Sequence, residues 1–202
     1  MSAGTVSARN PTIWFRPMRI ISGEFGSRRI QTPPGSTTRP TLDKTRESLF
    51  SILAGRLAGT KVLDLFAGSG ALGLEALSRG AVHAVFCDKS SQAAQAIADN
   101  IAALHLADRA KLMHMDWAQA LRSLAREHAS FDLIFLDPPY RMDYAPILQN
   151  IADSGLLIDD GLLIAEHDAK TTLLLPKGLA SSRQKDYRDT RIDFIHRERP
   201  TP

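Results

Sequence analysis

The stretch from Lys61 to Asp88 constrains the fold more than any other part of the sequence. Residues 62–66 are a short apolar run typical of a buried strand, and Gly68-Ser69-Gly70-Ala71-Leu72-Gly73 then fits the glycine fingerprint of a nucleotide-binding turn. The amphipathic run 71–78 predicts a helix whose N-terminus faces the ligand. A second strand, 84–87, ends in Asp88, where a carboxylate is placed to accept hydrogen bonds from two ribose hydroxyls. The unit therefore predicts a site for a ligand that contains adenosine.

From residue 61 onward, predicted strands and helices alternate along the chain. Such alternation implies a parallel sheet with helices on both faces, a Rossmann-like doubly wound α/β fold. A final antiparallel hairpin is expected at 181–188 and 191–197, and a small basic β-hairpin at 18–32, turning near 23–26, is expected before a helix at 43–57. The alternating segments are 61–66, 71–79, 82–88, 90–104, 110–115, 117–127, 131–136, 142–153 and 156–166.

Asp137-Pro138-Pro139-Tyr140 follows the apolar run 131–136. Two prolines stiffen this segment and remove two backbone donors. The Asp137 carboxylate and the Pro138 carbonyl can then accept both hydrogens of one planar amino group, while Tyr140 offers a ring face to a flat heterocycle. The alternative interpretation is a rigid turn with a solvent-facing Asp137. The tetrapeptide otherwise predicts a site that holds an exocyclic amine still.

The adenosine ligand is either a dinucleotide or S-adenosylmethionine. Asp64 lies inside the first strand, two residues before the turn, where a pyrophosphate would be repelled but an ammonium group would be tolerated. Asp137 falls at the end of the fourth strand, on the same carboxyl edge of the sheet. A hydride-transfer enzyme has no use for an amine clamp at that edge, so S-adenosylmethionine is favoured.

These motifs carry a resemblance to a known family. The chain resembles the class I S-adenosylmethionine-dependent methyltransferases, and more closely the RsmD family, which methylates guanine N2 in bacterial small-subunit ribosomal RNA. The resemblance spans residues 18–197, although residues 1–17 have no counterpart and Arg188, in the turn 185–190, stands where the family usually has glycine. The matching segments are 18–23, 26–30, 39–50, 66–70, 137–140 and 164–167.

The resemblance implies direct methyl transfer to guanine N2. The catalytic motif would be Asp137, Pro138, Pro139 and Tyr140. Asp116 would accept the adenine amino hydrogen and Trp117 would flank the ring, although Asp116 equally fits a helix N-cap and Trp117 ordinary packing. The full expected cofactor set is Asp64, Phe66, Gly68, Ser69, Gly70, Asp88, Lys89, Asp116 and Trp117.

Basic charge is concentrated ahead of this unit. Residues 1–60 carry nine Lys and Arg against three Asp and Glu, a net of +6, whereas residues 61–202 carry sixteen against nineteen, a net of −3. Such an asymmetry favours an RNA-contacting segment over residues 18–57, although exposed arginines are common on any surface. Some of these residues, with Thr41, would alternatively close over the cofactor. The candidates for RNA contact are Arg19, Arg28, Arg29, Arg39, Thr41, Lys44 and Arg46.

The remaining features set the domain plan. Residues 1–17 lack periodicity and an apolar core, so we expect a disordered extension rather than a targeting signal, followed by the segment 18–57 and a methyltransferase domain at 58–202. The single cysteine, Cys87, fits a buried position and a reducing cytoplasm, and no membrane-spanning run occurs. The six histidines are scattered, which predicts no metal site, and His167 is expected to be solvated or capping. We expect a monomer that acts on ribosomal RNA, within an assembling small subunit or as naked RNA.

Three other functions stay open at this point. An adenine-N6 DNA methyltransferase and a protein-amide methyltransferase would use the same amine clamp. A non-catalytic RNA-binding module is disfavoured, because a lapsed site has no physical need for the four acids Asp64, Asp88, Asp116 and Asp137. Which guanine is the target does not follow from the sequence.

Overall fold

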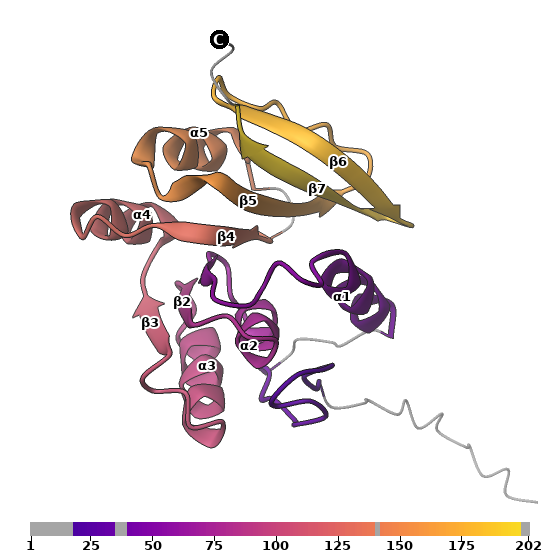
Figure 1. The fold of residues 1–202 in the computed structure, drawn as a ribbon, viewed down its shortest axis with the longest axis vertical. Coiled ribbons are helices and arrows are strands. Elements are labelled where there is room, and N and C mark those ends of the chain that lie inside the picture. The colour runs from indigo at the N-terminus through magenta and orange to yellow at the C-terminus, as the bar shows by residue number, and fades with distance from the viewer. Residues whose placement is uncertain (1–17, 35–39, 140–141, 199–202) are drawn as a thin grey trace, which may run out of the picture.

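The computed structural model describes residues 18–34, 40–139 and 142–198, without the side chains of residues 40–42. Its described part is a central sheet with helices on both faces (Figure 1). The elements are α1 (Pro40–Ile52), β1 (Lys61–Asp64), α2 (Ala71–Ser78), β2 (His83–Asp88), α3 (Ser91–Ala103), β3 (Ala110–His114), α4 (Trp117–Arg126), β4 (Phe131–Leu136), α5 (Ala145–Ser154), β5 (Leu157–Asp168), β6 (Leu179–Tyr187) and β7 (Thr190–Arg197).

The strands form a seven-stranded sheet in the order β3-β2-β1-β4-β5-β7-β6. Strands β1 to β5 are mutually parallel, and β7 runs antiparallel to both β5 and β6. The expected doubly wound, mostly parallel sheet with a C-terminal antiparallel hairpin is therefore confirmed. The strand order reverses between β1 and β4, and the crevice for a ligand in such sheets lies beyond the carboxyl ends of the strands at this switch point.

The core has two layers because the strands are covered on both faces. Neighbouring residues of β4 point to opposite sides: Phe135 packs in a cluster with Phe50 of α1 and Leu74 of α2, and Ile134 packs in the other cluster. The second cluster contains apolar residues of α4 and α5, among them Leu121. Helices α1, α2 and α3 thus cover one face, and α4 and α5 cover the other.

The N-terminal segment folds back on itself and docks on α2, but residues 18–34 form no strands of the expected β-hairpin. A single antiparallel bridge joins Arg19 to Arg29, with the turn between them. The buried carboxylate of Glu75 accepts hydrogen bonds from the backbone N–H of Ile21 at 2.6 Å and of Ser22 at 3.1 Å. Charged acceptors make strong hydrogen bonds when they are shielded from water, so Glu75 fixes this segment to the sheet domain.

The predicted helix at 43–57 was wrong at both ends. Helix α1 begins at Pro40, whose fixed φ suits the first turn, and ends at Ile52. The chain then leaves the helix through Gly55, which has a φ of 82° that glycine adopts at little cost. The apolar face predicted for this helix packs on the core all the same: Leu49, Phe50 and Leu53 are buried and Ile52 is half-buried.

The expectation of a solvated or capping His167 was also wrong. Its side chain is 1% exposed, and Nε2 lies 2.6 Å from Oδ2 of Asp193 on β7. Nδ1 faces the Asp168 carbonyl oxygen at 2.9 Å. Strand β7 pairs antiparallel with the end of β5 and shields His167 from solvent. The position of His167 at a strand end did not predict this neighbouring strand.

The C-terminal hairpin turns through Arg188 and Asp189, since Tyr187 pairs with Thr190. Arg188 has a φ of 50°, in the left-handed region that favours glycine. Cys87 is buried within β2, as expected. Among the described residues, no helix is both long enough and apolar enough to cross a bilayer.

Candidate active site at the carboxyl edge of the sheet

The glycine turn after β1 has the geometry that its sequence predicts. Gly70, with a φ of 77°, is the N-cap of α2. Gly73 lies against Phe86 of β2, and a Cβ atom there would come within 2.3 Å of the phenyl ring. The absent side chain lets α2 pack closely on the sheet, which brings the start of the helix to the switch point.

Two acids hold this turn. Asp88, at the end of β2, accepts a hydrogen bond from the Gly68 N–H at 2.9 Å through Oδ2, and one from the Ser90 N–H at 2.8 Å through Oδ1. Asp64, at the end of β1, is buried, and its Oδ2 accepts a hydrogen bond from the Gly73 N–H at 3.0 Å. Burial raises the pKa of Asp64 to about 7, and the nearby carboxylates of Asp137 and Asp88 add to the shift.

A pocket of about 440 Å³ opens at this edge. Asp116 at its wall is the N-cap of α4, and its Oδ1 accepts a hydrogen bond from the Ala118 N–H at 2.9 Å, so the capping interpretation holds. Ser69 and Asp64 line a neighbouring pocket of about 210 Å³ instead. The large pocket brings together Phe66, Gly68, Asp88, Lys89, Asp116 and Trp117 of the expected cofactor set, with Asp137, Pro138 and Pro139.

Asp137 and Glu166 line three adjoining pockets. A third pocket, of about 120 Å³, extends past Tyr144 and His167. Among the residues described as lining these pockets, Asp137 and Glu166 alone belong to all three. Asp137 follows β4 and Glu166 lies near the end of the adjacent parallel strand β5, so the sheet places both acids at one edge.

This pair has unusual electrostatics. Asp137 is exposed to solvent, as in the alternative interpretation of the tetrapeptide, but it lines three adjoining pockets where protein atoms crowd its carboxyl group. Desolvation raises the pKa of Asp137 to about 6. It raises the pKa of Glu166 to about 8, and the charge of Asp137 adds to that second shift. Perturbed carboxyl groups in a cleft are typical of functional sites.

Sequence reasoning noted the segment 164–167 but did not select Glu166 as a site residue. The rule that parallel strands present functional groups at their carboxyl ends would have found it. The hydroxyl of Tyr144 donates to the Glu166 carbonyl oxygen at 2.5 Å, which fixes the backbone at this position.

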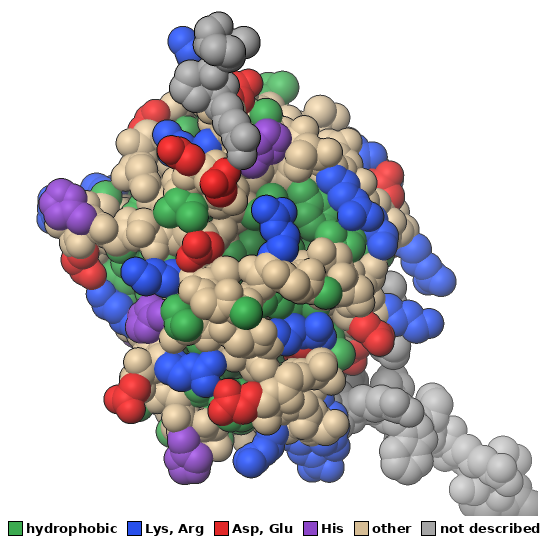
Figure 2. Space-filling view, in the orientation of Figure 1, with side chains coloured by type: hydrophobic (Ala, Val, Ile, Leu, Met, Phe, Trp, Pro, Cys, Tyr) green, Lys and Arg blue, Asp and Glu red, His purple; other side chains and the backbone are tan. Residues whose placement is uncertain are grey.

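The basic candidates fall into two groups. Arg19, Arg28, Arg29 and Lys44 are exposed, and Figure 2 shows Lys and Arg side chains along the lower edge, where the N-terminal segment lies. Arg46, by contrast, is buried. Tyr140, Arg39, the Thr41 side chain and the extension 1–17 lie outside the described residues. In the described part of the chain, no group of three or more His, Cys, Asp or Glu side chains could hold a metal ion.

A doubly wound sheet of this strand order, with a glycine turn, an acid at the end of β2 and Asp-Pro-Pro after β4, defines an S-adenosylmethionine-dependent methyltransferase. The family model described as "Conserved hypothetical protein 95" matches residues 18–196. The chain therefore belongs to this family, the RsmD family.

Individual relatives agree with this assignment. The chain is 40% identical over 172 residues to YlbH of Bacillus subtilis, a proposed rRNA methyltransferase, covering 84% of this chain and 94% of YlbH. It is 35% identical over 170 residues to ribosomal RNA small subunit methyltransferase D of Escherichia coli K12, covering 83% and 84% of the two chains.

Solved structures share the fold. YhhF of Escherichia coli, a proposed methyltransferase, has a TM-score of 0.77 at 33% identity, covering 90% of this chain and 98% of YhhF. SMU.776, a more distant protein solved with S-adenosylhomocysteine, has a TM-score of 0.63 at 20% identity and covers 79% and 50% of the two chains.

Proposed function

We propose that this protein transfers a methyl group from S-adenosylmethionine to the exocyclic N2 of a guanine in small-subunit ribosomal RNA. The name of the Escherichia coli relative supports the RNA class. The observation that carries the chemistry is the position of Asp137, which lines the large pocket and both of its neighbours. A substrate amine bound to Asp137 from one of the two neighbouring pockets would therefore face a cofactor bound in the large pocket.

The residues present fit the cofactor. Asp88 would accept hydrogen bonds from the ribose hydroxyls, and Asp116 with Trp117 would hold the adenine at the far wall of the large pocket. The turn at Gly68 would let the backbone approach the ligand closely. When bound, S-adenosylmethionine supplies the methyl group as a sulfonium electrophile and leaves as a neutral thioether.

Asp137 and the Pro138 carbonyl would bind the two hydrogens of guanine N2. That amine is a weak nucleophile because its lone pair is delocalised into the ring. Holding both hydrogens points the lone pair at the methyl carbon, and positioning of this kind can supply up to about 7–11 kcal/mol of the barrier in well-oriented reactions. Positive charge develops on nitrogen in the transition state, and the Asp137 carboxylate stabilises it.

The raised pKa of Asp137 suits the end of the reaction. The methylated nitrogen must lose one proton, and a carboxylate with a pKa of about 6 accepts a proton more readily than an ordinary aspartate. Stacking of the base on Tyr140, worth about 1–3 kcal/mol in comparable sites, stays a prediction.

The exposed basic residues support an RNA-contacting role for the N-terminal segment. Four exposed basic side chains precede the first strand of the sheet in the chain: Arg19, Arg28, Arg29 and Lys44. Phosphates would meet these side chains while the target base, flipped out of its helix or loop, enters the site near Asp137.

Incubation with labelled S-adenosylmethionine tests the proposal. The substrates are small-subunit ribosomal RNA, partly assembled small subunits and double-stranded DNA, followed by nucleoside analysis. Label in N2-methylguanosine is the expected result. Label in N6-methyladenosine of DNA, or in protein amide groups of the subunits, would overturn the assignment.

A further inference from the structure

The large pocket and the 210 Å³ pocket are neighbours that share part of their lining at the glycine turn. Both are lined by Phe66, Gly68, Asp137 and Glu166. If the adenosine of the cofactor lies by Asp88 and its sulfonium faces Asp137, its amino-acid end extends into the smaller pocket. That end carries an α-carboxylate and an α-ammonium group.

Most of the smaller pocket would repel an anion, because carboxylates line it; one cationic side chain is the exception. Four carboxylates line it, and Arg46 of α1 is the single cation among its lining residues. The Arg46 side chain is only 8% exposed. The carboxylates are those of Asp43, Asp64, Asp137 and Glu166.

Arg46 has hydrogen-bonding capacity to spare. One terminal nitrogen, Nη2, donates to the Arg19 carbonyl oxygen at 2.7 Å and to Asp43 Oδ1 at 3.2 Å. Its Nε is buried and has no hydrogen-bond partner in the described part of the protein. A buried donor without an acceptor is costly, and a guanidinium matches a carboxylate through two parallel donors.

We propose that Arg46 binds the α-carboxylate of S-adenosylmethionine. The inference follows from the lining that the two pockets share, the single cation among the lining residues of the smaller one, and the unpartnered Nε. It separates Arg46 from the exposed arginines of the same basic segment, with which sequence analysis had grouped it. It depends on the cofactor's orientation and not on which base is methylated.

A purely structural role is the competing explanation, because Arg46 also ties α1 to the N-terminal segment through the Arg19 carbonyl. A pair of ligands separates the two. S-adenosylhomocysteine carries the α-carboxylate, and its decarboxylated analogue differs by that group alone. The full-length wild type, Arg46→Gln and Arg46→Lys are titrated with each ligand by calorimetry.

We expect Arg46→Gln to weaken S-adenosylhomocysteine binding about 10- to 100-fold, the size of a lost charge-assisted hydrogen bond, and to leave binding of the decarboxylated analogue unchanged. Arg46→Lys keeps the positive charge but loses the two parallel N–H donors of the guanidinium, so its affinity for S-adenosylhomocysteine should lie between those of wild type and Arg46→Gln. Arg56→Gln, an exposed arginine just beyond α1, is the matched control and should bind both ligands as wild type does.

Equal weakening of both ligands, or unchanged affinity for S-adenosylhomocysteine, would overturn the proposal. Equal affinity of the wild-type protein for S-adenosylhomocysteine and its decarboxylated analogue would also overturn it. If Arg46→Gln does not fold, as judged by circular dichroism, the comparison of Arg46→Lys with wild type across the two ligands decides the question. A loss confined to RNA affinity and its salt dependence would return Arg46 to the RNA-contacting group.

Discussion

The Oδ2 atom of Asp88 accepts a hydrogen bond from the Gly68 N–H at 2.9 Å, which joins the end of β2 to the glycine turn after β1. The same carboxylate is proposed to bind the ribose, so it would both shape the turn and contact the ligand. We expect Asp88→Ala to weaken S-adenosylhomocysteine binding by about 1–3 kcal/mol, measured by calorimetry.

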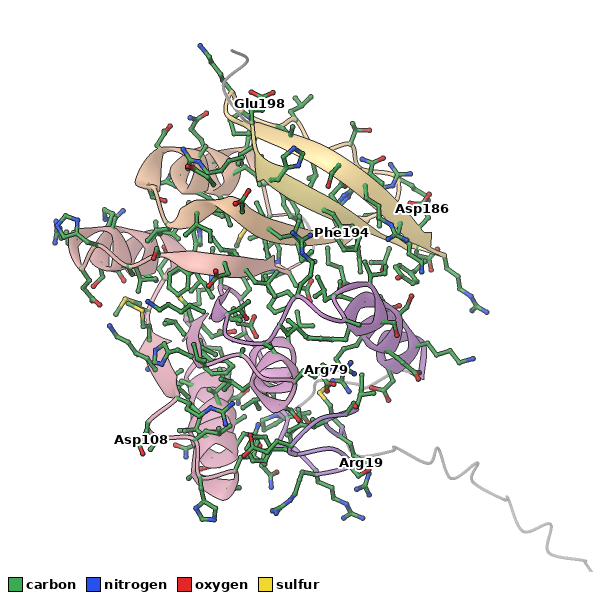
Figure 3. All side chains as sticks on the ribbon, in the orientation of Figure 1. Arg19, Arg79, Asp108, Asp186, Phe194 and Glu198 are labelled. Atoms are coloured by element: carbon green, nitrogen blue, oxygen red, sulfur yellow. The ribbon has the colours of Figure 1, made fainter. Side chains whose placement is uncertain are left out.

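Asp108→Ala is the control for this variant. Asp108 is exposed in the loop between α3 and β3, at the amino end of β3, and Figure 3 shows it away from the carboxyl edge. It should leave the affinity unchanged. If Asp88→Ala binds the ligand as wild type does, Asp88 is not the ribose acceptor.

Asp137→Ala should abolish methyl transfer while leaving cofactor affinity nearly intact. The carboxylate is proposed to hold the substrate amine, whereas the turn and Asp88 hold the cofactor. Single-turnover assays and calorimetry on the same sample separate the two effects. Asp137→Glu tests geometry, since one extra methylene displaces the charge, and turnover should also fall strongly. Loss of cofactor affinity in a folded Asp137→Ala protein would contradict this division of roles.

Glu166 makes the cofactor-free protein less stable as pH rises. Its pKa is about 8 in the folded protein against 4.5 ordinarily, so the folded state keeps a proton that the unfolded state has already lost. The free energy of unfolding therefore declines between pH 4.5 and about 8. In Glu166→Gln this decline should become shallower, as measured by urea denaturation across that range. Asp64, whose pKa is raised to about 7, contributes in the same direction and remains in the variant.

The exposed Glu47 of α1 offers a control for that experiment. Glu47→Gln should follow the wild-type pH profile. A wild-type stability that rises steadily from pH 4.5 to about 8 would show that these carboxyl groups are not protonated in the folded state.

Arg188→Gly should stabilise the protein. Arg188 has a φ of 50° in the β6–β7 turn, and the left-handed conformation costs a non-glycine residue roughly 1–2 kcal/mol. Glycine removes this cost but loses more chain entropy, so a net gain of about 1 kcal/mol or less is expected in chemical denaturation. Arg188→Ala, which removes the side chain and keeps the strain, should give no comparable gain. Equal effects of the two changes would assign the result to the lost charge.

Neutralising Arg28 and Arg29 together should weaken RNA binding and flatten its salt dependence. Each lost phosphate contact lowers the log–log slope by about 0.7–0.9. Filter binding at several salt concentrations measures the slope. The charge-matched control is Arg122→Gln with Arg126→Gln, exposed residues of α4 on the opposite face of the sheet. Equal slopes for the two double variants would move the RNA surface elsewhere.

Much of the fold was predictable because its signals are local. The expected strand at 131–136 matches β4 in full, and most of the other strands and helices of the sheet domain agree within two residues. Each of these signals depends only on residues that are close in the sequence: the periodicity of the strands, the spacing of Gly68, Gly70 and Gly73, and the proline pair after β4. The parallel arrangement then placed Asp88 and Asp137 on one edge without any knowledge of tertiary contacts.

The tertiary structure decided what burial and distant partners control. Arg19 and Arg46 are both arginines of the basic N-terminal segment, and the sequence does not distinguish them. In the structure Arg19 is exposed, whereas Arg46 is buried and lines the pocket beside the glycine turn. His167 acquires its partner Asp193 from a strand that returns antiparallel to its own. The sequence by itself determined the sheet, the glycine turn and the position of Asp137-Pro138-Pro139 after β4, because these depend on backbone preferences over a few residues. The packing of α1 on the sheet buries Arg46, and the pairing of β7 with β5 buries His167. Such burial removes water from charged side chains, which changes their partners and the roles proposed for them.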